Sequence, residues 1–137
     1  MELRFAESFD AEMNALFQTH PAEVELIDAL FDELAADQEQ LDSLLDVVPK
    51  WHYFFEPSFE IKRFRECWDR KLRIYTLKLY GEDGHLIDYR VLAGHNQDEG
   101  VLFVLSVQPR SSAYDTTTQE FSALCATYEQ LGIPKIR

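Results

Sequence analysis

The sequence lacks most of the features that mark membrane, redox or secreted proteins. Its 137 residues include two cysteines, five glycines and five prolines, and the apolar run from Val101 to Val107 is far shorter than the roughly 20 residues of a membrane helix. Cys67 and Cys125 form no CxxC pair, so we expect reduced thiols. The acidic N-terminal stretch lacks the basic start and apolar segment of a secretory signal, which predicts a cytoplasmic protein without a membrane segment.

Several catalytic motifs are also missing. The glycines, at positions 81, 84, 94, 100 and 132, form no phosphate-binding loop, which excludes a P-loop nucleotide hydrolase. The four histidines have no metal-ligand spacing, and no serine stands in the GxSxG context of an acyl hydrolase. We therefore expect neither a metal site nor another cofactor.

What the chain has is the composition of a folded domain. Hydrophobic residues make up 46% of it and aromatic residues 13%, and a chain of this length buries roughly 68–70% of its unfolded surface. We predict a single domain over residues 1–137. It has three parts: an acidic helical part (1–50), a connection rich in aromatic and basic residues that the sequence does not place (51–71), and a strand meander with a C-terminal helix (72–137).

Charge is unevenly distributed along the chain. The net charge is −12, but residues 1–50 hold 13 acidic and 2 basic residues, whereas residues 51–137 hold 12 and 11. A net negative charge argues against nucleic-acid binding, yet this segregation leaves the second half with a local basic stretch. The stretch contains Lys62, Arg63, Arg65, Arg70, Lys71, Arg73 and Lys78. Two interpretations stay open: it is a solvated face that neutralises the acidic helices, or it binds an anionic partner.

Apolar periodicity predicts the elements of the acidic part. A short strand is expected at residues 2–5, followed by a helix that Asp10 caps and a second helix that begins at Pro21. A third helix is expected to end at Pro49. Helices with one apolar stripe need a sheet on which to bury that stripe.

The last part supplies the expected sheet. Alternating residues predict strands at residues 72–80 and 87–93, and the continuously apolar stretch 101–107 predicts a strand covered on both faces. Thr117 and Glu120 have the spacing of a capping box for a final helix. The predicted fold is α+β: an N-terminal strand and a helical hairpin packed on a small antiparallel sheet, with a C-terminal helix.

Polar side chains on these strands are the candidates for chemistry. Adjacent strands carry two of them and two follow the third strand: Lys78, Arg90, Arg110 and Tyr114. Arg90 interrupts an apolar strand, so its guanidinium either pairs with an acid such as Asp88 or Glu99 or reaches outward to an anion.

Taken together, the segments LRIYTLKLY, DYRVLAGH and GVLFVLSVQPRSSAYD resemble the RelE/ParE toxin superfamily. Its members carry a YxIKL-like strand, a YRxxY strand, and a VISV strand followed by basic residues and a tyrosine. The resemblance covers residues 72–115 and implies a RelE-like fold for the chain. The order of the first strand and the helical hairpin agrees with the family.

The resemblance also implies an activity. RelE-like members are metal-independent endoribonucleases that cut messenger RNA in the ribosomal decoding site and are neutralised by an antitoxin protein. Attack by a ribose 2′-hydroxyl needs a base and a stabiliser of phosphate charge. By the family's pattern, Arg90 and Arg110 would stabilise charge, Lys78 would be the base or an RNA anchor, and Tyr114 would stack on a base or transfer a proton. The local basic stretch would supply the RNA-binding residues of such an enzyme, which are Lys62, Arg63, Arg70, Lys71 and Arg73.

Other functions on the same fold stay open. Thr76 stands where ribosome-dependent members often have another lysine, and the segment from Val107 to Tyr114 is shorter than theirs. The superfamily also contains ParE-like inhibitors of DNA gyrase that cleave no RNA. A further alternative is a non-catalytic protein-binding module, whose acidic helices bind a basic partner and in which Arg90 is a structural ion pair.

Overall fold

A computed structural model describes residues 1–46, 50–52 and 58–137, and its architecture is α+β. One mixed six-stranded sheet has the order β1-β6-β5-β4-β3-β2. Its strands are β1 (Glu2–Phe5), β2 (Lys50–His52), β3 (Phe59–Arg63), β4 (Ile74–Leu79), β5 (Tyr89–Asn96) and β6 (Val101–Pro109). All neighbouring pairs are antiparallel except β1 and β6, which are parallel.

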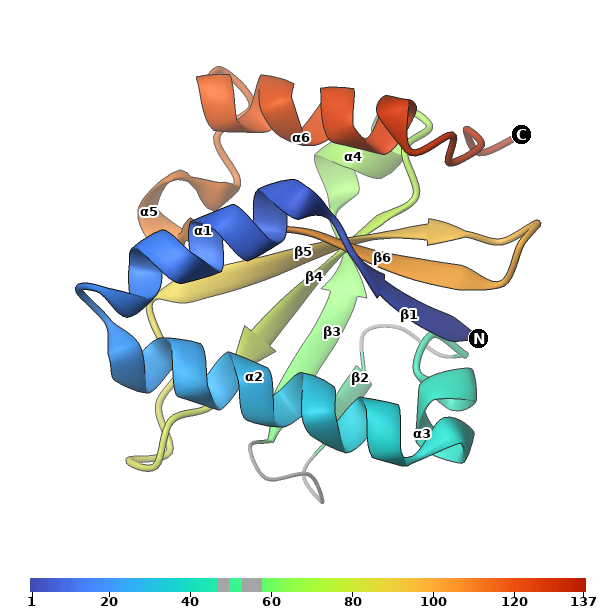
Figure 1. Ribbon diagram of the computed structural model, residues 1–137. Coiled ribbons are helices and arrows are strands. Elements are labelled where there is room, and N and C mark those ends of the chain that lie inside the picture. The colour runs from blue at the N-terminus through green and yellow to red at the C-terminus, as the bar shows by residue number, and fades with distance from the viewer. Residues whose placement is uncertain (47–49, 53–57) are drawn as a thin grey trace.

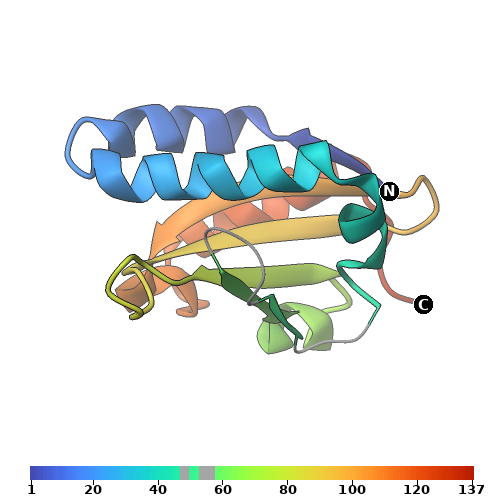
Figure 2. The same ribbon diagram turned by 90° about the horizontal axis from the view of Figure 1, so that it is seen from below.

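Helices cover both faces of this sheet (Figures 1 and 2). The first three, α1 (Glu7–Phe17), α2 (Pro21–Ala36) and α3 (Gln38–Ser43), follow β1 along the chain. The others are α4 (Arg65–Asp69), α5 (Arg110–Ala113) and α6 (Gln119–Gln130). Figure 2 shows α1 and α2 as a layer on one side of the sheet and α4 on the other. No helix in the described ranges is long and apolar enough to cross a membrane.

Two hydrophobic cores result, one on each face. The first core joins α1, α2 and α3 to side chains such as Tyr75 and Val91. The second core joins α4 and α6 to side chains such as Ile74 and Leu92. Because neighbouring residues of β4 and β5 enter different cores, the predicted alternation of these strands is confirmed. Cys67, in the second core, is a free thiol whose pKa is raised by burial to about 12.

The observed sheet is larger than the predicted one and is not wholly antiparallel. The unplaced segment 51–71 supplies β3 and α4, and Phe59 and Ile61 of β3 are fully buried in the first core. The sheet is mixed because β1 pairs in parallel with β6. The aromatic residues Tyr53 to Phe55 lie outside the described residues.

Three helix boundaries differ from the prediction. The first helix begins at Glu7 instead of after Asp10, because the Ala6 carbonyl already accepts the first helical hydrogen bond, from the Asp10 amide at 3.2 Å. The last helix is capped by Thr118, whose hydroxyl accepts a hydrogen bond from the Phe121 amide at 3.1 Å. Thr117 instead donates its hydroxyl to Asp115. The third helix ends at Ser43, and its predicted end at Pro49 lies outside the described residues.

Two irregularities shape the second core. A β-bulge between β5 and β6 leaves Leu105 without an opposite residue, because Leu92 pairs with Ser106 while Ala93 pairs with Val104. At Gly94, a Cβ atom would lie 3.0 to 3.1 Å from the side chains of Ile133, Leu105 and Tyr128. The missing side chain at Gly94 therefore allows α6 to pack closely on the sheet.

The edge of β6 is closed by a helix where β1 ends. β1 pairs with β6 only as far as Val104, and α1 then runs beside the rest of that edge. The Ser8 hydroxyl donates to the Leu105 carbonyl at 2.9 Å, and the Glu12 carboxylate accepts from the Val107 amide at 3.0 Å. Glu12 also accepts from the Ser106 hydroxyl at 2.8 Å. Side chains of α1 thus take the place of a pairing strand.

We expect Glu12→Leu to lower the free energy of unfolding by about 1–3 kcal/mol, because the Val107 amide would lose its acceptor. Glu12→Gln should cost less, since its amide oxygen still accepts. Burial raises the pKa of Glu12 above 4.5, so the folded state holds its proton more tightly than the unfolded state. Wild type should therefore lose stability relative to Glu12→Gln as pH rises from 4.5 through the folded pKa. Urea titrations at several pH values test both expectations.

Candidate functional site

Three cationic side chains gather on the face of the sheet that carries the second core. They are Lys62 on β3, Lys78 on β4 and Arg90 on β5, and we call them the basic cluster. In the β3–β4 pair, Lys62 lies opposite Thr76, and Lys78 lies opposite Glu60. In the β4–β5 pair, Leu77 lies opposite Val91, which places Arg90 beside Lys78. Same-face neighbours on adjacent strands lie close enough for their side chains to interact. The sheet register therefore brings together three positive charges.

Partial burial and repulsion from the neighbouring cations lower the pKa of Lys78. Its pKa is lowered to about 8, first by burial and then by the neighbouring ammonium group of Lys62, with a smaller contribution from Arg90. The negative charge of Glu60 acts in the opposite direction. No ion pair is formed by Lys62, Lys78 or Arg90 within the part of the chain that the structure describes. A lysine in this environment is partly neutral near physiological pH.

Arg90 is buried, with 3% of its surface exposed. One terminal nitrogen donates to the carbonyl oxygens of Ile87 and Tyr89 at 2.8 and 3.1 Å. The predicted ion pair with Asp88 or Glu99 is wrong within the described ranges, because the guanidinium instead folds back onto backbone carbonyls at the start of β5 and just before it. The alternative, an outward reach to an anion, does not describe this buried side chain either.

Buried polar atoms without protein partners lie on the same face. They are the Nε of Arg90, the hydroxyl of Thr76 and the hydroxyl of Tyr114. Thr76 pairs with Lys62 across the β3–β4 ladder, and the Tyr114 ring packs on Phe64 with 5.4 Å between centroids. Buried polar groups in folded proteins nearly always have a bonding partner. Within the described residues, these three buried atoms therefore leave hydrogen-bonding capacity unused on the face that carries the basic cluster.

The structure does not place Arg110 with the basic cluster. Arg110 begins α5 and is exposed, and it lines a pocket of about 520 Å³ together with His20, Glu23 and Tyr89. Tyr89 packs against the first core, so this pocket lies toward the α1–α2 side of the sheet. Of the four predicted catalytic residues, Lys78 and Arg90 are brought together. Tyr114 lies on the same face as they do.

The five predicted RNA-binding residues are divided among different places. Lys62 joins the basic cluster, whereas the guanidinium carbons of Arg63 and Arg73 lie 4.2 and 5.1 Å from the ring centre of Trp68. Arg70 lies over Phe121 at 4.8 Å. Lys71 is exposed at the end of α4. Sequence reasoning missed that Lys62 is beside Lys78, although the alternation of residues 59–63 contains that signal.

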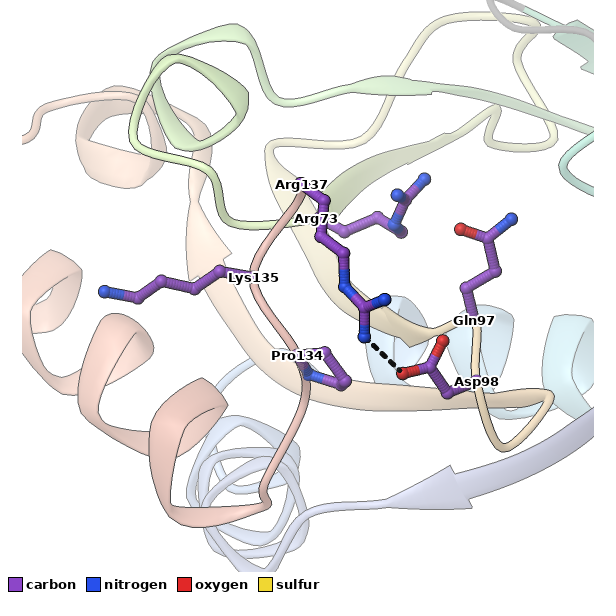
Figure 3. A pocket seen from close by; sticks show the side chains of 6 residues that line it. All are labelled: Arg73, Gln97, Asp98, Pro134, Lys135 and Arg137. Atoms are coloured by element: carbon purple, nitrogen blue, oxygen red, sulfur yellow. Dashed lines mark ion pairs between the residues drawn. The ribbon is translucent and has the colours of Figure 1, made fainter.

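A small pocket beside the C-terminus collects further cations (Figure 3). It measures about 220 Å³ and is lined by Arg73, Gln97, Asp98, Pro134, Lys135 and Arg137. Asp98 pairs with Arg137 at 3.7 Å, which offsets part of the positive charge. In Figure 3 the Lys135 side chain points away from the other lining side chains.

Comparisons with known proteins give no match to this chain among protein-family models, curated proteins or solved structures.

Lys71 occupies a backbone conformation that favours glycine. Its φ is +68°, and the amides of Lys71 and Leu72 donate to the carbonyls of Trp68 and Cys67 in the pattern that ends many helices. A left-handed conformation costs a side-chain-bearing residue about 1–2 kcal/mol. We expect Lys71→Gly to raise the free energy of unfolding by about 0.5–1 kcal/mol, as measured by urea denaturation. Lys71→Ala keeps the strained φ and should give no such gain.

Proposed function

We propose that this chain is a cytoplasmic endoribonuclease of the RelE-like type and that the basic cluster is its cleavage site. The observation that carries the proposal is a lysine with a pKa lowered to about 8 between two other cations. The sequence resemblance to the RelE/ParE superfamily supports the same class of activity. The substrate would be messenger RNA, either alone or held by the ribosome.

Lys78 would act as the general base. The neutral form of an amine with a pKa near 8 is present in a substantial fraction at neutral pH, whereas an ordinary lysine is almost wholly protonated. Neutral Lys78 would accept the proton of a ribose 2′-hydroxyl. The 2′-oxygen would then form a bond to the adjacent phosphorus, and the bond from phosphorus to the 5′-oxygen would break. The products would be a 2′,3′-cyclic phosphate and a 5′-hydroxyl that has gained a proton.

Arg90 and Lys62 would stabilise the negative charge that develops on the phosphate. The guanidinium of Arg90 is buried and held by two backbone carbonyls, so it would act on the phosphate through its fixed positive charge. A charge fixed before the reaction needs no reorganisation when the opposite charge develops. The predicted roles of Tyr114 in stacking or proton transfer and of Arg110 in charge stabilisation remain predictions.

The acidic net charge is compatible with an RNA substrate because the charges are segregated in space. The helices α1, α2 and α3, which hold most of the acids of residues 1–50, cover the first core. The basic cluster lies on the opposite face of the sheet. RNA that approaches this face would meet local positive charge while the acidic layer is turned away.

A second candidate is a module that binds a basic protein partner. A groove of about 650 Å³ lies between α2 and residues 81–88, and it combines apolar side chains such as Leu26 and Ile87 with several acids. The acids are Glu23, Glu25, Glu82, Asp83 and Asp88. This combination suits a basic amphipathic segment, either of an antitoxin or of another partner.

Substitution of the basic cluster tests the cleavage proposal. We expect Lys78→Gln to lower the cleavage rate by about 10²–10⁴-fold, because the general base is lost. Arg90→Lys should lower it by about 10²–10³-fold, since an ammonium group cannot reproduce the guanidinium contacts. Induced expression followed by primer extension on cellular messengers locates the cuts, and purified protein with ribosomes and messenger gives the rates.

Controls separate lost chemistry from lost folding. Lys135→Gln removes one exposed positive charge outside the basic cluster and should cleave as wild type does. Circular dichroism checks that each variant is folded. A 2′-deoxy nucleotide at the cut should block cleavage, because the nucleophile is missing. Growth arrest without RNA cuts would instead favour a ParE-like inhibitor, and no arrest at all would favour the protein-binding module.

The pH profile gives an independent test of the base. Cleavage should rise about tenfold per pH unit below the Lys78 pKa of about 8 and level off above it. Lys62→Gln removes the neighbouring charge that lowers this pKa, so its profile should shift toward higher pH. Single-turnover rates over a pH series measure both effects. A profile that is flat from acidic to alkaline pH would contradict the role of Lys78.

A further inference from the structure

Trp68 is held in a fixed orientation at the end of α4. Its indole nitrogen donates to the Ile74 carbonyl at 2.9 Å, and its ring makes an edge contact with Tyr75 at 5.7 Å between centroids. Trp68 packs against the first core while remaining partly exposed. Although Cys67 of α4 enters the second core, the Trp68 ring packs on Tyr75 of the first core, so the indole is a rigid platform at the molecular surface on the side of the sheet opposite to the basic cluster.

Two arginines lie over this platform. The guanidinium carbons of Arg63 and Arg73 are 4.2 and 5.1 Å from the ring centre, so they are at most about 9 Å apart. Neither arginine forms an ion pair within the described part of the chain. Both positive charges also act on the buried Tyr75 hydroxyl. We call Arg63, Trp68 and Arg73 the arginine cluster.

The backbone beneath the arginine cluster is fixed by distant parts of the chain. Arg63 pairs with Tyr75 across the β3–β4 ladder. The amide of Arg73 donates to the hydroxyl of the fully buried Tyr128 at 3.1 Å, and its carbonyl accepts from the His95 amide at 2.9 Å. Side chains placed on such a frame lose little conformational freedom when they bind a ligand.

We propose that the arginine cluster binds a phosphate group of a single-stranded RNA, at a point separate from the site of cleavage. This inference rests on the proposed function for the identity of the strand. Planar guanidinium groups can each donate two parallel hydrogen bonds to phosphate oxygens, and stacking on an indole leaves the nitrogens at the edge free to do so. An anion between the two groups would relieve their mutual repulsion.

The direction of the neighbouring side chains agrees with an open approach. In Figure 3, Arg137 extends to Asp98, while the Arg73 side chain takes another direction, on the side of the pocket where Gln97 lies. Arg73 thus faces the indole and the Tyr75 hydroxyl instead of Asp98. Because Lys62 and Arg63 are adjacent on β3, their side chains emerge on opposite faces. One RNA strand that passes around this end of the sheet would meet both clusters.

Binding of a short fluorescent 2′-O-methyl RNA, measured by anisotropy over a salt series, tests the arginine cluster. This probe has no nucleophilic 2′-hydroxyl, so it reports affinity without cleavage. We expect Arg63→Gln and Arg73→Gln each to weaken binding about tenfold at low salt. Each should also reduce the slope of log K against log salt by about 0.7, the value for one phosphate contact on a single strand.

Two further variants keep the test decisive. Arg4→Gln removes an exposed arginine of β1 that also lies over an aromatic ring, that of Phe103 on β6, and it should bind as wild type does. Arg63→Lys keeps the charge but loses the planar group, so it should weaken binding while leaving the salt slope unchanged. Arg63→Lys also tests the arginine cluster if Arg63→Gln does not fold.

The two proposals can fail separately. Weaker binding of the Arg63 and Arg73 variants in a protein that never cleaves RNA would support the arginine cluster and reject the cleavage site. Cleavage of RNA by wild type, together with unchanged RNA binding by these variants, would support the cleavage site and reject the arginine cluster. Failure of wild type to bind the RNA probe at low salt would overturn the arginine cluster, as would an equal loss of binding in Arg4→Gln.

Discussion

The structure depends on how the edge of β6 is satisfied. This strand contributes to both cores and is buried along most of its length, yet β1 pairs with only part of it. Ser8 and Glu12 of α1 bond to the backbone of β6 beyond that point, and this fixes α1 against the sheet. The hydrogen bonds that Glu12 accepts oppose the rise in pKa that its burial causes. A helix thus completes a sheet edge, at the cost of placing an acid in a partly dry environment.

The same edge is connected to the candidate site. Ser106 donates to Glu12 and accepts from the Gln108 side chain, and Gln108 pairs with Arg90 across the β5–β6 ladder. The bulge at Leu105 sets the register in which Gln108 lies opposite Arg90. The basic cluster therefore belongs to a polar row that crosses the sheet on the face that carries the second core. Within the described residues its cations form no ion pair, and most acids of residues 1–50 are on helices of the other face.

Local patterns predicted much of the fold and part of the site. Alternation found β4 and β5 with their faces, and the apolar stretch found β6, because each strand is specified by residues within it. The caps were less well predicted, since Thr117 and Thr118 are equally suited by type and only their hydrogen bonds distinguish them. Residues 51–71 could not be placed, because Phe59 and Ile61 show their role only when they meet helices from the first part. Lys78 and Arg90 were paired correctly through the predicted meander.

The sequence alone determined the α+β composition, the three-strand meander and the separation of acidic from basic halves, since these follow from residue order and periodicity. Tertiary structure decided which cations share a site. Lys62 and Arg63 are neighbours in the chain but lie on opposite faces, and Lys62 meets Lys78 across a strand pair that the sequence did not reveal. The lowered pKa of Lys78 and the stacking of two arginines on Trp68 arise in the same way. Both depend on distances through space and on burial, which no local pattern of residues encodes.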